Sequence, residues 1–104
     1  MTDITKNQFK MENPAFSGMD KDGNPFSIRA AAARQEYDDE DKIFLNKIVA
    51  RIVHIDRGAK ITDNITADNG VFDRVKNTVT LTGNVRVDSS NGDKVRTKEM
   101  VIRL

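Results

Sequence analysis

The sequence contains no cysteine, no tryptophan and a single histidine among its 104 residues. The absence of cysteine excludes disulfide bonds as a source of stability. Only 6% of the residues are aromatic, so a core must be built mainly from Val, Ile, Leu and Ala. With 17 Lys and Arg against 16 Asp and Glu, and no basic block, the chain does not read as a nucleic-acid binder that neutralises phosphates.

The sequence also lacks a long hydrophobic run. No apolar stretch approaches the roughly 20 residues that a transmembrane helix needs. Residues 1–10 are mostly polar and contain no apolar run, so they do not form a signal peptide. The protein is therefore either cytosolic or a piece cut downstream of its targeting segment. We expect residues 1–8 to be a disordered leader and residues 9–104 to form a single domain, because no linker divides them.

Reactive groups are sparse as well. His54 is the only histidine, and Val53 and Ile55 beside it suggest a strand position with a structural or surface role. Asp20-Lys-Asp-Gly-Asn24 partly matches a calcium loop, but its twelfth position is Ala31 instead of Glu, so a tight turn is the better interpretation. The glycines are scattered singly, which does not fit a phosphate-binding loop. We expect no enzymatic activity, no metal site and no cofactor.

The clearest pattern that is present runs from Asn77 to Asp88. Side chains alternate across a strand, so this segment has one apolar and one polar face. The first face carries Val79, Leu81, Gly83, Val85 and Val87. The second carries Thr78, Thr80, Thr82, Asn84 and Arg86.

Similar segments recur at offsets of 34 to 37 residues. The matched pairs are 43–45 with 79–81, 28–30 with 65–67, 37–38 with 72–73, and 58–61 with 92–95. A repeated strand-turn-strand unit with one-sided apolar faces predicts a layered all-β fold.

Turn signals divide the chain into strands about ten residues apart, which is typical of a sandwich, barrel or roll. The turns are marked by Asp22-Gly23, Arg57-Gly58, Asn69-Gly70 and Asn91-Gly92. The expected strands are 16–18, 25–31, 43–54, 60–67, 70–72, 78–88 and 94–104. Pro14 and Pro25 fit strand starts or edges. Ala30–Glu36 has high helix propensity, so a strand end with a bend or one helical turn is expected there, and 37–42 is expected to be an acidic, solvated turn.

These patterns leave three non-catalytic functions open. Stacked apolar faces can form a packed core or line a cavity for an apolar ligand. Open sheet edges can join other sheets by main-chain pairing. The domain can also be a scaffold in a larger protein.

Longer motifs resemble a known family. The segment 11–35, with Phe16-Ser-Gly18, Asp22-Gly23 and Pro25-Phe26, resembles the opening of the periplasmic domain of the LptC family. The segments 65–73 (Ile-Thr-Ala-Asp-Asn-Gly-Val-Phe-Asp) and 81–87 (Leu-Thr-Gly-Asn-Val-Arg-Val) resemble the unit that LptC shares with LptA and OstA-like domains. The resemblance covers almost everything after Phe9.

The resemblance implies a twisted, open β-jellyroll that is anchored to the inner membrane and lies in the periplasm. Such domains shield the acyl chains of lipid A and pass lipopolysaccharide from the inner-membrane ABC transporter to LptA. Their N-terminal end meets the periplasmic domains of the transporter, and their C-terminal end meets LptA. The alternative is an assembly domain that pairs edge to edge with partners without binding lipid. ATP hydrolysis lies elsewhere in the machine.

If the roll is correct, an inward-facing set can be named. Each member is either plain core or a lipid contact. The set is Phe26, Ile28, Leu45, Phe72, Val79, Leu81, Val85, Val87 and Ile102.

The chain departs from the family pattern at both ends. The resemblance implies an N-terminal membrane anchor that the given sequence does not include, and a domain that extends beyond Leu104. We therefore expect the roll to be incomplete at its C-terminus and to self-associate through an exposed edge strand.

Overall fold

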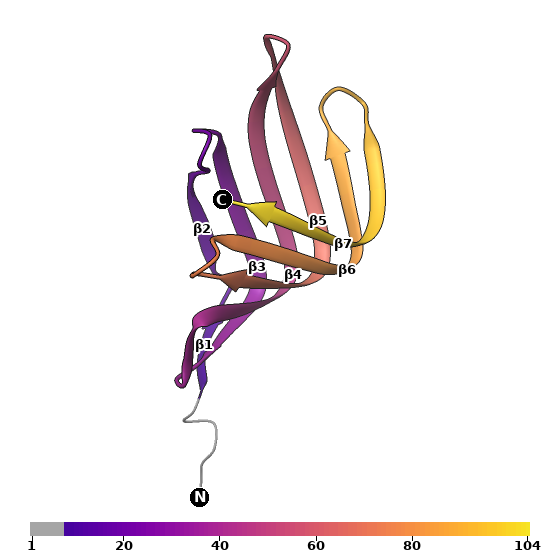
Figure 1. The fold of residues 1–104 in the computed structure, drawn as a ribbon. Coiled ribbons are helices and arrows are strands. Elements are labelled where there is room, and N and C mark those ends of the chain that lie inside the picture. The colour runs from indigo at the N-terminus through magenta and orange to yellow at the C-terminus, as the bar shows by residue number, and fades with distance from the viewer. Residues whose placement is uncertain (1–7) are drawn as a thin grey trace, which may run out of the picture.

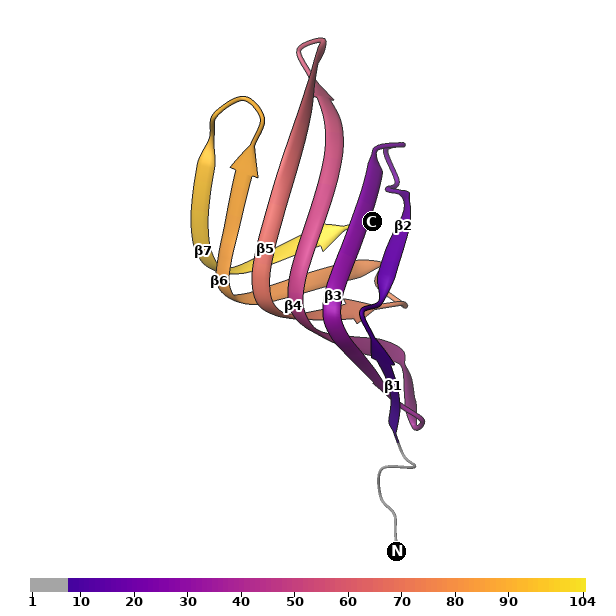
Figure 2. The same cartoon turned by 180° about the vertical axis from the view of Figure 1, so that it is seen from behind.

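The computed structural model describes residues 8–104, which form one antiparallel sheet of seven strands (Figures 1 and 2). The strands are β1 (Gln8–Glu12), β2 (Ala15–Met19), β3 (Pro25–Glu36), β4 (Asp39–Asp56), β5 (Ala59–Asp73), β6 (Thr78–Ser89) and β7 (Lys94–Arg103). The order across the sheet is β1-β3-β4-β5-β6-β7, and β2 also pairs with β3. The all-β prediction and the open roll are confirmed. Residues 1–7 lie outside the described part, so the leader stays a prediction.

The first edge of the sheet is interrupted. β2 pairs with the first half of β3 and β1 pairs with its second half, so together they form one edge strand with a break at Asn13-Pro14. Asn13 has a φ of 49°, and its amide donates to the carbonyl of Ala31 at 2.9 Å. Pro14 lacks an amide hydrogen, which suits a position on an edge.

Every long strand crosses a bend in the middle of the sheet. Buried side chains are two residues apart within each half of a strand, as expected for a strand with one buried face. In β3, β4 and β5 the step across the bend is three residues: Ala30 to Ala33, Leu45 to Ile48, and Ala67 to Gly70. A step of three would place the second residue on the opposite face of a flat strand, so the backbone must turn there to keep both residues inside.

In β6 the corresponding step is four residues, from Leu81 to Val85. Gly83 and Asn84 both have positive φ values, of 81° and 48°, and the register with both neighbouring strands shifts at this point. This is a β-bulge, which adds a residue and bends the strand. The apolar alternation predicted for Val79–Val87 is therefore preserved, but it is carried around a corner.

The bend divides the sheet into two arms (Figures 1 and 2). The upper arm contains β2 and residues 25–30, 48–56, 59–67, 85–89 and 94–97. The lower arm contains β1 and residues 32–36, 39–46, 69–73, 78–82 and 99–103. The lower-arm parts of β5, β6 and β7 sweep across the concave side, so the chain end at Leu104 comes near β2 and β3.

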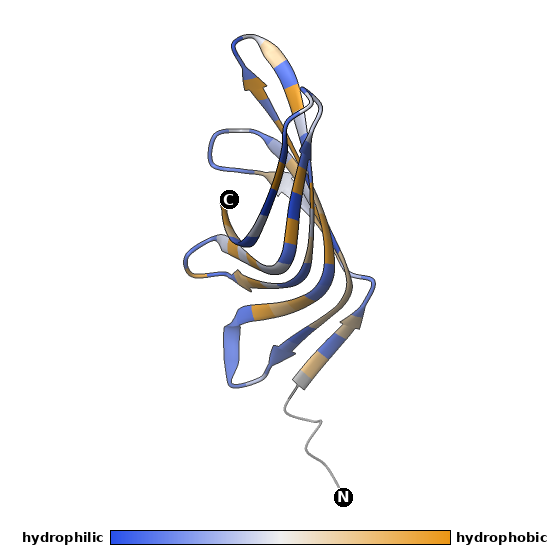
Figure 3. Cartoon of the chain, turned by 90° about the vertical axis from the view of Figure 1, so that its right-hand side faces the viewer, coloured by the Kyte–Doolittle hydropathy of each residue, from blue (hydrophilic) through white to orange (hydrophobic). Residues whose placement is uncertain are grey.

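The concave side holds the core. Figure 3 shows the curved sheet from the side, with hydrophobic and hydrophilic bands alternating along the strands. The most deeply buried large side chains are Leu45, Ile48, Ile65, Val79, Leu81 and Val85. The residue pairs 43/79, 45/81, 28/65 and 30/67 occupy equivalent buried positions two strands apart, which confirms these parts of the repeat. Tyr37 and Phe72 are not equivalent, because Tyr37 lies in an exposed turn.

Some local predictions were wrong. Ala30–Glu36 continues β3 as strand, because pairing with β1 and β4 on both sides outweighs the helix propensity of the alanines. The segment 37–42 forms a turn only at Tyr37-Asp38. Residues 60–67 and 70–72 belong to one strand, β5, so Asn69-Gly70 is not a turn. Strand β1 was not predicted.

The β2–β3 connection is the tight turn that the sequence indicated. Asp20 Oδ1 accepts hydrogen bonds from the backbone amides of Asp22 at 2.9 Å and Asn24 at 2.8 Å. The bond from the Asn24 amide is the main cause that lowers the pKa of Asp20 below its ordinary value.

No helix in the described part of the chain is long and apolar enough to span a bilayer.

Candidate functional site

A cavity of about 220 Å³ lies on the concave side, between the upper arm and the end of the chain. Its wall is almost entirely apolar and comes from five strands and the C-terminal residue. The lining residues are Phe16, Ser17, Phe26, Ile28, Leu45, Phe72, Val79 and Leu104. The cavity exists because the bend brings strands that are not neighbours in the sheet to face one another.

An aromatic contact joins the two arms across this cavity. The ring centroids of Phe16, on β2, and Phe72, on β5, are 6.5 Å apart, and the rings are tilted by 59°. Such tilted pairs are favourable beyond the area they bury. Two strands, β3 and β4, lie between β2 and β5 in the sheet, so this contact forms only because the sheet is folded over.

All nine predicted residues belong to the core or pack against it. Phe26 and Phe72 are partly buried, and the other seven are buried: Ile28, Leu45, Val79, Leu81, Val85, Val87 and Ile102. Five of the nine line the cavity: Phe26, Ile28, Leu45, Phe72 and Val79. Leu81 and Val85 are fully buried and do not line it, so they serve as packed core in this conformation.

Sequence reasoning missed three lining residues, Phe16, Ser17 and Leu104. Phe16 was placed in a strand, and its position between polar and small residues gave no sign of which face it would occupy. The alternation in Lys94–Leu104 contained a signal for Leu104, because Met100, Ile102 and Leu104 are two residues apart and all pack on the core. Ile48 and Ala50 on β4, and Ile65 and Ala67 on β5, were also missed, although each pair has the two-residue spacing of a buried strand face.

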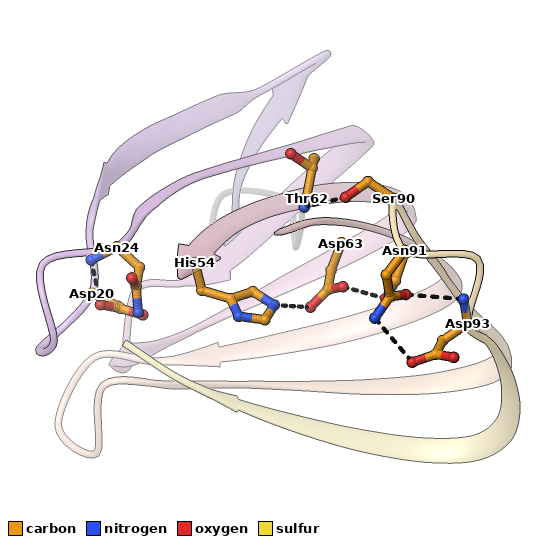
Figure 4. Close-up of polar contacts among 9 residues, drawn as sticks. Asp20, Asn24, His54, Thr62, Asp63, Ser90, Asn91 and Asp93 are labelled. Carbon is orange, nitrogen blue, oxygen red and sulfur yellow. Dashed lines mark hydrogen bonds and ion pairs between the residues drawn. The ribbon is translucent and has the colours of Figure 1, made fainter. Parts of the chain in front are cut away.

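A row of hydrogen-bonded polar side chains lies on the concave face near the tips of the upper arm (Figure 4). His54 Nε2 and Asp63 Oδ2 make a hydrogen bond of 3.0 Å, and the Ser89 hydroxyl donates to Asp63 Oδ1. The carboxylate stands between the histidine and the serine, so the histidine cannot take the serine proton as it would in a hydrolase triad. The row instead satisfies three polar groups next to the apolar layer of Ile65 and Val87.

The family model described as "Lipopolysaccharide-assembly, LptC-related" matches residues 2–104. The chain belongs to the LptC family. No functionally curated protein matches the chain significantly.

Membership of the LptC family gives the domain a role in lipopolysaccharide transport. The LptC family describes a periplasmic domain of a protein that is anchored in the inner membrane. This protein is a transport component and is not known as an enzyme. The apolar interior of this LptC-type domain is therefore the candidate site. Its aliphatic and aromatic walls offer contacts without direction, which suit a chain of methylene groups better than a polar ligand.

Proposed function

We propose that the interior between the two arms shields the acyl chains of lipopolysaccharide while the lipid is passed from the inner-membrane transporter to LptA. The observation that carries this proposal is the apolar cavity lined by Phe26, Phe72 and Val79. Burial of an acyl chain is favourable by about 0.8 kcal/mol for each CH₂ group. Contacts of this kind have no preferred orientation, so a chain can slide along them.

The size of the cavity defines what must happen when the lipid enters. A cavity of roughly 150 Å³ is large enough for one benzene molecule. The cavity of about 220 Å³ is therefore too small for several acyl chains at once. The arms must move apart, and the Phe16–Phe72 contact allows this because it is a side-chain contact between strands that do not pair.

The two edges of the sheet are the proposed joints with partner proteins. β1 and β2 form the N-terminal edge and β7 forms the C-terminal edge. Edge strands carry backbone groups that can pair with another sheet. In this proposal the N-terminal edge receives the periplasmic domains of the transporter, and the β7 edge receives LptA.

Site-specific photocrosslinking tests the interior. A photoreactive residue in place of Val79 should capture lipopolysaccharide, because this side chain lines the cavity. The same residue in place of Thr80 should not, because the next position along β6 points to the opposite face. Phe72 and Val71 form a second matched pair on β5, and Phe72 is only partly buried, so its replacement is less disruptive.

Equal capture at the inner and outer positions of both pairs would contradict the lipid-shielding proposal. An assembly domain that does not bind lipid would give no lipopolysaccharide adduct at either Val79 or Phe72, yet would still crosslink to partner proteins from β7. Circular dichroism of each variant establishes that the sheet has formed.

A further inference from the structure

The outer face of the upper arm is strongly basic. Five strands contribute side chains to it, and the cross-strand register places them in rows. One row reads Arg29, Val49, Thr66, Arg86 and Arg96. The next row reads Ser27, Arg51, Asn64, Asp88 and Lys94.

We call this surface the basic face and define it by its exposed charged residues on the strands and at the bend. It carries eight cations and two carboxylates, a formal charge of +6 in a chain whose total is +1. The cations are Arg29, Lys47, Arg51, Lys60, Arg86, Lys94, Arg96 and Lys98. The carboxylates are Asp68 and Asp88. The turns at the strand ends carry charges of both signs and are not included.

Most of this positive charge is not neutralised within the domain. Among residues 8–104, the only salt bridge made by these cations joins Lys94 to Asp88 at 3.4 Å. Arg86 lies directly opposite Arg96 on the neighbouring strand. Like charges at such a position destabilise a sheet unless an anion lies between them.

The basic face also has shape. Shallow grooves lie between the outward side chains, and each is lined by cations. One groove has Arg86, Arg96 and Lys98 in its wall. Another has Arg29 and Lys47 beside Val49, whose side chain is 54% exposed. Guanidinium groups around an exposed apolar side chain are suited to a layer of phosphate headgroups above acyl chains.

The longest run of acidic residues lies at the other end of the domain. Asp38 lies in the β3–β4 turn and Asp39, Glu40 and Asp41 begin β4, at the far end of this strand from the β4–β5 turn on the upper arm. The molecule is 57 Å long, so the two charged regions are well separated. Such an uneven distribution orients a molecule on a charged surface, with the basic face toward the anions.

We propose that the basic face lies on the anionic surface of a phospholipid bilayer. The family is anchored in the inner membrane, so a bilayer is close to this domain. The anionic lipids of a bilayer surface attract clusters of Lys and Arg that lie within about a Debye length of it. The concave side with its cavity then faces away from the bilayer. The inference does not depend on lipid in the interior, since Val79 and Phe72 are not part of this face.

Flotation with vesicles tests the basic face. The 104-residue chain is mixed with vesicles of phosphatidylcholine alone, or of phosphatidylcholine with phosphatidylglycerol, at low and high salt. We expect binding only to the phosphatidylglycerol vesicles and only at low salt. The triple variant Arg29→Gln, Arg86→Gln, Arg96→Gln should bind on the order of 100-fold more weakly, because each cation near such a surface contributes about a five-fold gain.

The control is the triple variant Lys42→Gln, Lys76→Gln, Arg103→Gln. It removes the same net charge from exposed positions of the lower arm and of the β5–β6 turn at its end, and should bind as the wild type does. Absence of binding to phosphatidylglycerol vesicles at low salt, or an equal loss in both triple variants, would overturn the proposal. It would also be overturned if lipid-free sedimentation showed dimers that only the first triple variant breaks, because the occupant would then be the acidic turn of a second copy.

Discussion

At the scale of single residues, positive φ values occur in the turns and also where the sheet bends. Asn13, Lys47, Gly83 and Asn84 lie along the bend. Glycine and asparagine adopt this conformation readily, but lysine does not. Lys47, with a φ of 54°, is therefore a strained residue in the middle of β4, with a cost of the order of 1 kcal/mol.

Replacement of Lys47 by glycine should stabilise the domain. The side chain is exposed, so little packing is lost, and glycine removes the left-handed strain. We expect the free energy of unfolding to rise by about 0.5 kcal/mol, since the greater freedom of glycine in the unfolded chain offsets part of the gain. Urea denaturation followed by circular dichroism measures this change.

Lys60→Gly is the matched control. Lys60 is also an exposed lysine in a strand, but its φ is not positive. The substitution should lower the free energy of unfolding by about 0.5 to 1 kcal/mol. A loss of stability in both variants would mean that the backbone at Lys47 is not strained.

At the scale of strands, the bend depends on how closely β4, β5 and β6 approach one another. Gly70 is the buried residue of β5 on the lower-arm side of the bend. Its φ is not positive, so glycine is not required there for backbone conformation. A Cβ atom on Gly70 would clash with Ile48 Cδ1 and lie 3.1 Å from Leu81 Cδ2, so the lack of a side chain makes room for these two core residues.

Gly70→Ala should destabilise the domain by about 1 to 3 kcal/mol through overpacking. Ile48→Val removes the Cδ1 atom that the new methyl group would meet. The double variant should therefore be less destabilised than the sum of the two single variants, with a coupling of at least about 0.5 kcal/mol. Chemical denaturation of the four proteins gives the cycle.

Gly18→Ala is the control for this cycle. An added Cβ there would be 3.5 Å from the Phe26 ring, an ordinary contact, so its effect should be small and should add to that of Ile48→Val. Additivity of Gly70→Ala with Ile48→Val would show that the crowding at the bend is relieved elsewhere.

At the scale of the whole molecule, an open sheet leaves two edges to manage. β7 pairs with β6 on one side and is the last strand of the sheet. It carries two exposed apolar residues, Val95 and Val101, with 52% and 47% of their surfaces accessible. An exposed edge with apolar side chains tends to pair with another sheet.

We expect the chain to self-associate through β7 as its concentration rises. Val95→Lys with Val101→Lys should shift the protein to monomer, because charged lysines on an edge oppose strand pairing. Val75→Lys makes the same chemical change in the β5–β6 turn, at a residue that is 71% exposed, and should leave association unchanged. Sedimentation velocity over a range of concentrations distinguishes these outcomes, and a wild-type monomer throughout would refute the expectation.

Much of the fold was predictable because strand patterns are local. The alternation in 78–88 identified Val79, Leu81, Val85 and Val87 as inward-facing, and all four are buried. The prediction failed at Ala30–Glu36, where helix propensity is a local quantity but strand pairing is not. It also missed the three-residue steps at the bend. Within a single segment, a shift of the apolar alternation by one residue looks like the end of one strand and the start of another.

The sequence by itself determined that the chain is all-β, which side of most strands is apolar, and that the family is LptC, because each of these depends on short-range patterns of residues. Only the tertiary structure decided that the sheet folds over so that Phe16 contacts Phe72, which encloses a cavity. It also decided that lysines and arginines spread along five strands share one face. Both results depend on the register between strands and on the bend, which bring together residues that are far apart in the chain.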